Sequence, residues 1–367
     1  MRFLKAGSPK PLLKTLHITS EQKTAMTINA SNLEGDTLVW QDALYEGPLL
    51  ADMSLDALST RRAEYFSQLG WGEYSDIMKL YQQRNAVVSS FLQYSEIVLW
   101  FDSGLNNQLQ LVQLIEWFSR QQTRHVVISV VSRARLPDVI GFVDFALLTE
   151  RQLEKLFHSR TEVTNAQITI CHNAWRALTA QNPTGLLHCF PRDMTSMPYL
   201  KNAMLRFVQQ FPSKSNGLSK TEQLIIYVLR SQQKSDELLD QQAQMERTYL
   251  DVQGKEPIPF MSRAIFYAYF QNMMLSEQPI IAKHVVEQTE ALEISEEDGG
   301  EDLVMEAIVV EKKTRLTLTK LSGQISNNWV DWVQINGINR WLGGVYLRDG
   351  NIWRYSADTR QLIKTYV

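Results

Sequence analysis

Short apolar runs alternate with helix-like spacing over the first 150 residues of the chain. Four runs are rich in strand-forming residues and end on polar ones, at residues 15–19, 37–42, 96–101 and 125–131. Between them, apolar residues recur every three or four positions over residues 55–93, with a break at 70–72, and over residues 107–119. Strands that alternate with helices are typical of parallel β-α units with right-handed crossovers. This pattern predicts a fold of the α/β class, with an open, mostly parallel sheet and flanking helices over residues 15–148, after a flexible arm of residues 1–14.

A helical pattern without strands follows over residues 149–211. Thr149 stands where the N-cap of the first of these helices is expected, and Pro212 closes the region. We therefore expect residues 149–211 to form a helical connecting region.

The remaining residues, 212–367, have the element order of a winged helix, which is three helices and then a pair of strands. Ser219 and Glu222 form an S-x-x-E capping box at the start of the first helix. Two more helical segments cover about residues 235–250 and 259–275. The pattern predicts a winged-helix-like carboxy-terminal module.

The expected strand pair of this module consists of residues 279–286 and 315–321. Between them, residues 290–302 hold seven acids and no base, which predicts a solvated, mobile loop. Further along, Asp349-Gly350 predicts the two-residue turn of a terminal hairpin over residues 343–355.

The composition is that of an ordinary globular protein, with 44% hydrophobic and 21% charged residues among 367. That length predicts two or three structural units. A formal net charge of −3 gives the chain as a whole no attraction to nucleic acid or to an anionic membrane. No apolar run approaches the roughly 18 to 20 residues of a membrane span, and the amino terminus lacks the apolar core of a secretory signal. With only two cysteines, the chain is expected in a reducing cytoplasm.

Polar residues gather where the predicted strands end, and they form our candidate binding site. The set consists of His17, Thr19, Asp42, Glu46, Asp102, Asn106, Asn107 and Gln108. In open parallel sheets, ligands bind at the carboxyl ends of the strands, near the point where the strand order reverses. The start of a helix offers unpaired amides to a phosphate or carboxylate, and nearby carboxylates suit ribose hydroxyls or a divalent ion such as Mg²⁺. We therefore expect a small anionic ligand there, either a nucleotide or a phosphorylated metabolite.

Each part of this set also has an ordinary structural interpretation. Asp102 is suited to capping its own turn, Asn106 to capping the helix that follows, and residues 46–48 to forming a plain turn. Standard nucleotide motifs are absent, because residues 17–24 contain neither G-x-G-x-x-G nor a P-loop.

Two Cys-His pairs, Cys171-His172 and His188-Cys189, lie on either side of a loop and suggest a zinc site. Tetrahedral zinc needs four converging ligands, whereas adjacent residues on one element point in different directions. We therefore expect no metal there, and buried thiols with local histidine hydrogen bonds instead. The motifs G-x-S-x-G and H-E-x-x-H are also absent, which disfavours a hydrolase with a conventional triad.

A winged-helix-like module leaves DNA binding and protein docking as alternatives. Residues 201–290 hold 10 basic and 10 acidic residues, a balance that supplies little of the phosphate neutralisation that dominates DNA affinity. Four tryptophans close to the carboxyl terminus, at positions 329, 332, 341 and 353, are typical of core packing. Alternatively, Arg340, Trp341 and Trp353 form an aromatic docking face for a protein partner.

Several motifs resemble two bacterial families of unknown function. Residues 15–19 (TLHIT), 38–48 (LVWQDALYEGP) and 98–111 (VLWFDSGLNNQLQL) resemble the domain-of-unknown-function family numbered 1835. Residues 212–226 (PSKSNGLSKTEQLII) and 338–347 (INRWLGGVYL) resemble the family numbered 3658, which often follows it. The resemblance covers roughly residues 15–355 and implies a bacterial origin and a two-part architecture, without an established activity.

The chain departs from the pattern of the first family at four positions. A histidine often stands where this chain has Tyr45, and acidic or histidine residues often stand where it has Ser103, Gly104 and Asn106. No catalytic role is therefore carried over to these positions.

Three functional hypotheses follow. The first is a binding or regulatory protein that recognises a small anionic ligand at the strand ends and a partner through the carboxy-terminal module. The second is an enzyme that uses Asp42, Glu46 and Asp102, with Mg²⁺, on a nucleotide or phosphorylated substrate. The third is a DNA-binding regulator.

Overall fold

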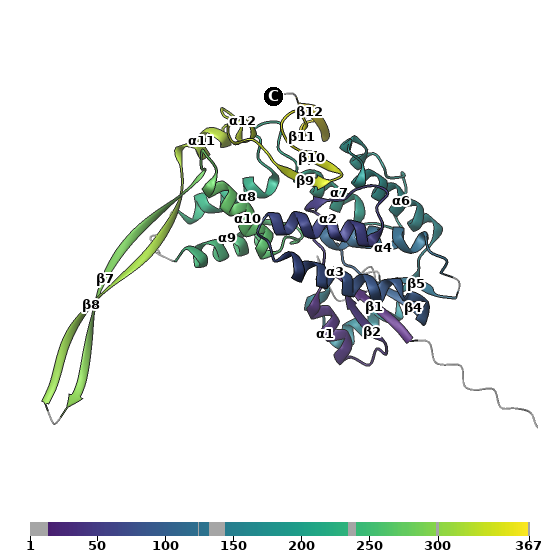
Figure 1. The fold of residues 1–367 in the computed structure, drawn as a ribbon, viewed down its shortest axis with the longest axis horizontal. Helices are drawn as coiled ribbons and strands as arrows, with labels where there is room; N and C mark the ends of the chain where they lie inside the picture. Colours follow the sequence, from purple (N-terminus) through teal and green to yellow (C-terminus); the bar gives the residue numbers. More distant parts are fainter. Residues whose placement is uncertain (1–13, 124, 132–143, 234–239, 299–300, 366–367) are drawn as a thin grey trace, which may run out of the picture. The chain divides into compact units, whose positions relative to one another are not determined.

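The chain divides into two compact units (Figure 1). The computed structural model describes residues 14–123, 125–131, 144–233, 240–298 and 301–365, with the backbone alone for residues 287–313. Among these, the first unit comprises the residues up to 208 together with 339–347, and the second comprises 209–338 and those from 348 onward. The expected flexible arm lies outside the described residues, apart from Lys14.

This division differs from the expected one in two places. The region 149–208, predicted as a connection, is part of the first unit, and so is the segment 339–347, which we assigned to the carboxy-terminal module. Both are held there by long-range packing, which the local pattern of apolar residues does not record.

The first unit is built on a five-stranded sheet in the order β2-β1-β4-β5-β6. Its parallel strands are β1 (Lys14–Thr19), β2 (Asp36–Val39), β4 (Tyr94–Trp100) and β5 (Val127–Val131), and β6 (Thr161–Glu162) adds an antiparallel edge. The structure thus confirms the open, mostly parallel sheet that the apolar runs predict.

Strand alternation divides the sheet's side chains between two faces. Val98 and Trp100 of β4 pack in one core cluster with Ile28 of α1 (Gln22–Ala30) and with α5 (Glu150–His158). The intervening Leu99 is fully buried and points to the opposite face, because successive strand residues alternate. Both faces of the sheet are therefore covered, which explains why its strands are continuously apolar.

Helix α4 (Leu105–Ser119) joins β4 to β5 and packs against α6 (Asn165–Thr179) and α7 (Leu200–Val208). It is buried on nearly every side, although it carries five buried polar or charged residues: Asn107, Gln108, Gln110, Gln113 and Glu116. Buried polar groups need hydrogen-bond partners, so these side chains must find partners in neighbouring loops and helices.

Two further helices of the first unit, α2 (Leu55–Gln68) and α3 (Tyr74–Ser89), pack against each other. They confirm the helical spacing over 55–93, and Gly70, with a φ of +72°, ends the first of them in the predicted break.

A small second sheet brings distant parts of the sequence together in the same unit. Strand β3 (Gly47–Pro48) pairs in parallel with β9 (Arg340–Gly343), which also pairs with β10 (Val345–Leu347). The segment 46–48, interpreted above as a plain turn, is therefore partly a short strand.

The second unit has the helix and strand order of the predicted winged helix. Helices α8 (Lys220–Gln232), α9 (Gln241–Lys255) and α10 (Arg263–Leu275) are followed by the antiparallel strands β7 (Ile281–Asp298) and β8 (Glu301–Leu318), which lie side by side in Figure 1. Two short helices, α11 (Lys320–Ser326) and α12 (Trp332–Asn336), and a hairpin of β11 (Ile352–Ser356) and β12 (Gln361–Thr365) complete it. The capping box of Ser219 and Glu222 is present at the start of α8.

Two expectations for this unit are wrong. Residues 290–298 and 301–302, predicted as part of a loop, are strand, because the acidic stretch faces the β-prone run 303–310 (LVMEAIVV) along the ladder and β7 and β8 pair along their whole lengths. The turn at Asp349-Gly350 is formed, but the hairpin around it is limited to one bridge, between Arg348 and Asn351. The flanking strands pair elsewhere, β10 with β9 and β11 with β12.

Candidate functional site

The strand order places a reversal point between β1 and β4. From β1 the chain moves to β2 on one side, and β4 then pairs with β1 on its other side. Ligands of open α/β sheets bind beside the carboxyl ends of the two strands at such a point. Here β1 ends at Thr19 and is followed by Ser20, and β4 is followed by Phe101 to Ser103.

Asp102 lies at this point as a buried carboxyl with no cationic partner among the described residues. Its side chain is 4% exposed, and its Oδ1 accepts a hydrogen bond from the Gly104 amide at 2.7 Å. Burial raises the pKa of this carboxyl to about 7, and the charges of Asp144 and Glu21 add to the rise, against the lowering effect of the Gly104 and Phe145 amides. In the described part of the chain, no basic side chain forms an ion pair with Asp102.

Ser103, the next residue, is a buried polar side chain with no partner in the described ranges. It is 3% exposed, and its Oγ makes no hydrogen bond to any residue that the structure describes. Gly104 is the N-cap of α4 and provides no side-chain cap, so the first turn of a 15-residue helix begins beside an unsatisfied hydroxyl. Such a group in a native structure requires an explanation, and a bound ligand is one.

The three predicted amides connect the loops around this point. Asn106 accepts a hydrogen bond from the Leu44 amide at 3.1 Å, and Asn107 accepts one from the Ser20 hydroxyl at 2.6 Å. Gln108 donates to the Asp102 carbonyl at 2.6 Å. The interpretation of Asn106 as an N-cap is wrong, because the helix begins at Leu105. These side chains position the loops that follow β1, β2 and β4.

Asp42 belongs to a buried ion-pair network. Arg62 donates to its Oδ1 at 2.6 Å and Arg84 to its Oδ2 at 3.0 Å, while the Tyr81 hydroxyl donates to Oδ1 at 3.1 Å. Burial by itself would raise the pKa of the Asp42 carboxyl, but the charges of Arg62 and Arg84 outweigh burial and hold that pKa below its ordinary value. Asp42 is therefore neutralised inside the protein.

Glu46 also has an arginine partner, but here burial outweighs the charge of Arg340 and raises the pKa of the Glu46 carboxyl above its ordinary value. Arg340 of β9 forms two hydrogen bonds with its carboxylate, at 3.0 and 2.7 Å, and the Glu46 side chain is buried. The structure does not bring Asp42, Glu46 and Asp102 together as free carboxylates, because the first two already carry arginine partners. Among the described residues, no group of three or more histidine, cysteine, aspartate or glutamate side chains is arranged to hold a metal ion.

His17 and Thr19 are integrated into the sheet. Trp100 donates its indole N–H to His17 Nδ1 at 3.1 Å, so the neutral ring carries its proton on Nε2, 3.3 Å from the Glu34 carbonyl. Burial lowers the pKa of His17 and keeps the ring neutral. The Thr19 hydroxyl donates to the Glu21 carbonyl at 2.9 Å. Both residues therefore support the strand rather than project from its end.

The three residues proposed for partner docking are also engaged inside the chain. Arg340 binds Glu46, and Trp341 stacks on Tyr346 with ring centroids 4.8 Å apart. Trp353 is buried in β11.

The Cys-His pairs do not converge. Cys171 is buried, and His172 Nδ1 lies 3.1 Å from the Glu116 carboxylate, whereas His188 and Cys189 line a separate cavity. These four side chains, all within the described residues, therefore do not surround a common point.

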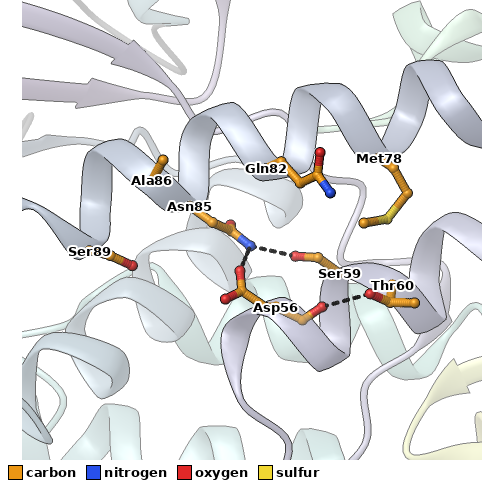
Figure 2. A pocket seen from close by; sticks show the side chains of 8 residues that line it. All are labelled: Asp56, Ser59, Thr60, Met78, Gln82, Asn85, Ala86 and Ser89. Atoms are coloured by element: carbon orange, nitrogen blue, oxygen red, sulfur yellow. Dashed lines mark hydrogen bonds between the residues drawn. The ribbon is translucent and has the colours of Figure 1, made fainter.

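A groove between α2 and α3 is a second candidate, with a volume of about 460 Å³. Figure 2 shows the Asn85 amide reaching from α3 to α2, where it donates to Asp56 at 2.8 Å and to Ser59 at 3.0 Å. These hydrogen bonds join the two helices that form the walls of the groove. The polar groups at the centre of the groove therefore serve helix packing.

The arginines that neutralise Asp42 were not among the residues predicted for the site. Arg62 lies four residues after Leu58 and four before Phe66, on the buried face of α2, and Arg84 lies between Tyr81 and Val88 on the buried face of α3. A basic residue within an apolar stripe indicates a buried acidic partner, and this pattern was available in the sequence. No comparable pattern indicates Glu21 or Asp144 as neighbours of Asp102.

A scan against protein-family models and a search of curated proteins found no match for the chain. The resemblance to families 1835 and 3658 therefore stays a prediction from the motifs. No helix in the described ranges is both long and apolar enough to cross a membrane.

Proposed function

We propose that the protein binds a small phosphorylated metabolite or nucleotide at the reversal point between β1 and β4, as a binding or regulatory protein. The observation that carries the proposal is the Ser103 hydroxyl, which is buried beside Asp102 at the amino terminus of α4 and has no partner in the part of the chain that the structure describes. The helix start and the hydroxyl suit a phosphoryl oxygen. The cytoplasmic location expected from the two cysteines belongs to the same proposal.

The protonation state of the Asp102 carboxyl controls how such a ligand binds. With a pKa of about 7, its carboxyl is half protonated near neutrality and donates a hydrogen bond to a phosphoryl oxygen in its protonated form. The charges of Glu21 and Asp144 oppose a second negative charge nearby and favour hydroxyl groups, such as those of a ribose, on the rest of the ligand.

A second candidate function is proton transfer by Asp102 in an enzyme. A carboxyl with a pKa near 7 at a strand-end crevice is suited to general acid–base catalysis. The three-carboxylate Mg²⁺ enzyme has less support, because Asp42 and Glu46 already pair with arginines. The DNA-binding hypothesis rests on the order of elements alone, and the equal numbers of acidic and basic residues over 201–290 do not favour it.

The test is a thermal-shift screen of nucleotides and sugar phosphates, followed by titrations of any hit at pH 6 and pH 8. If the ligand binds only when Asp102 is protonated, its affinity is about tenfold weaker at pH 8 than at pH 6, because the protonated fraction of a carboxyl with a pKa of about 7 falls by that factor. Asp102→Asn removes this pH dependence, and Ser103→Ala weakens binding at both pH values. Asp358→Asn, at an exposed turn, serves as the control and behaves as wild type.

Two outcomes would overturn the proposal. One is the absence of a thermal shift with every compound tested at concentrations up to about 10 mM, which is ten times the roughly 1 mM dissociation constant of a weakly bound metabolite. The other is a ligand whose affinity is the same in wild type and in Ser103→Ala.

A further inference from the structure

The last two turns of α6 and the loop after it line a shallow, open cavity of about 440 Å³ in the first unit, with Arg176 and His188 exposed at its rim. It is lined by Asn173, Arg176 and Ala177 of α6 and by Gly185, His188 and Cys189 at and after the 3₁₀ helix Pro183–Leu187. A cavity of this volume lies within the range of small-molecule sites.

The polar groups of this cavity are basic or neutral, and no acidic residue lines it. Arg176, His188 and Asn173 make no side-chain hydrogen bond or ion pair with any residue in the described ranges. Arg62, Arg84, Arg160, Arg340 and Arg354, by contrast, each have a carboxylate partner. The cavity therefore presents hydrogen-bond donors that face solvent, with no carboxylate lining it to compete for them.

The local sequence explains why these side chains face the cavity. Residues 173, 176 and 177 are three and four positions apart, so they share one face of α6. The buried positions 170, 171, 174 and 178 form its core-facing side. Asn182 caps the short helix that follows, by accepting hydrogen bonds from the Thr184 amide and hydroxyl, and this cap fixes the turn that brings His188 back toward α6.

Cys189 lines the cavity, so the rate of its chemical modification can be used to detect a ligand bound there. Its thiol lies 3.6 Å from the Leu186 carbonyl, to which it donates, and burial raises its pKa to about 11. A thiol with a raised pKa is a poor nucleophile, so covalent catalysis by this cysteine is disfavoured. Cys171, the chain's other cysteine, is fully buried.

We propose that this cavity binds the oxyanion group, phosphoryl or carboxylate, of a small metabolite, independently of the site at Asp102. Arg176 supplies a planar pair of donors that matches two oxygens of such a group, and His188 and Asn173 supply further donors across the cavity. The competing explanation is that Arg176 only favours the carboxyl end of α6 through the helix dipole, with solvent around it. That explanation predicts no saturable binding.

The experiment measures the rate at which iodoacetamide, a neutral reagent, alkylates Cys189. Phosphate and acetate are titrated separately, with chloride holding the ionic strength constant so that screening does not change. Peptide mass spectrometry separates Cys189 from the buried Cys171, which serves as an internal reference. We expect at least one of the two anions to slow alkylation of Cys189 saturably, by fivefold or more, and the stronger one identifies the group recognised.

Variants assign the effect to the cavity. Arg176→Gln abolishes the protection and His188→Gln weakens it severalfold, whereas Arg192→Gln, an exposed arginine that does not line the cavity, retains it. Asp102→Asn also retains it, which separates this site from the proposed function. Unchanged alkylation with both anions, or equal protection in wild type and in both cavity variants, would overturn the proposal.

Discussion

Asp42 and Asp102 are both buried aspartates, and their surroundings give them opposite properties. Asp42 has two arginines within 3.0 Å, whereas Asp102 has a backbone amide at 2.7 Å and acidic neighbours. A buried charge needs a partner or a shifted pKa, and each residue represents one of these two solutions. Only Asp102 therefore retains a proton to exchange near neutral pH.

Removing the charge of Asp42 is expected to destabilise the first unit strongly. Asp42→Asn leaves the guanidinium groups of Arg62 and Arg84 buried without an anion, which costs about 3 to 5 kcal/mol in the free energy of unfolding. Chemical denaturation measures the change. Glu64→Gln breaks the exposed pair of Glu64 with Arg61 and costs less than about 1 kcal/mol. A loss below about 1 kcal/mol in Asp42→Asn would contradict this account of the network.

Asp102 is expected to make stability fall as the pH rises. Its pKa is about 7 in the folded chain against an ordinary 3.8, so the folded state binds more protons between these values. The contribution is therefore fully present below about pH 4 and is lost as the pH rises through 7.

Asp102→Asn cannot lose a proton, so it is expected to unfold at the same free energy as wild type near pH 4 and at a higher one at pH 8. At pH 8 we expect the variant's free energy of unfolding to exceed that of wild type by roughly 1 to 3 kcal/mol. A rise in pKa from 3.8 to about 7 allows at most about 4 kcal/mol. Denaturation curves at the two pH values measure it, with Asp358→Asn as the exposed control. A variant less stable than wild type at both pH values would refute the assignment.

At the scale of elements, helix starts follow local rules and buried helices depend on distant partners. The capping boxes at Thr149, Thr164 and Ser219 each join an N-cap to the side chain three residues later. Helix α4 instead begins at Gly104 with no side-chain cap, and its amides bind loops up to 87 residues away. Local sequence therefore predicts the start of α8 well and the role of Asn107 poorly.

The cap of α8 is expected to contribute measurably to its stability. Ser219→Ala leaves the Glu222 amide without its acceptor in a buried position and costs about 1 kcal/mol. Hydrogen exchange at Glu222 and denaturation measure the loss. Ser231→Ala, at the exposed end of the same helix, stays within about 0.5 kcal/mol of wild type. Similar effects of the two substitutions would contradict the capping role.

At the scale of the whole molecule, the segment 339–347 is part of the first unit although it lies more than 130 residues after the rest of that unit. Arg340 binds Glu46, β9 pairs with β3, and the Gly344 amide donates to the Leu178 carbonyl at 2.7 Å. Two glycines allow this approach. A Cβ on Gly343 would overlap the Leu178 carbonyl oxygen, and one on Gly344 would overlap the Thr179 backbone.

Gly344→Ala is therefore expected to displace this segment. Overlap with fixed backbone costs about 1 to 3 kcal/mol, so thermal unfolding begins at a lower temperature and proteases cleave near residue 344 sooner. Gly254→Ala, in α9 with open space around the added methyl group, is the control and is neutral or slightly stabilising. A Gly344→Ala variant as stable and protease-resistant as wild type would show that the segment is not held closely.

The local features of this protein follow from short stretches of its sequence. The apolar runs at 15–19 and 96–101 are strands, the spacing over 55–93 is helical with a break at Gly70, and Thr149 and Ser219 start helices. These features depend on residues within one or two turns of each other, so a single segment contains the information. The position of Asp102 at the end of a buried strand belongs to the same class.

Which side chains contact each other depends on the tertiary structure. Asp42 and Glu46 have the same pattern as Asp102 in the sequence, at the end of an apolar run, yet their partners lie at positions 62, 84 and 340. The acidic stretch at 290–298 is strand because it pairs with 301–309, against its local composition. Charge neutralisation and strand pairing are contacts between distant segments, and their energies exceed the local preferences that a sequence pattern records.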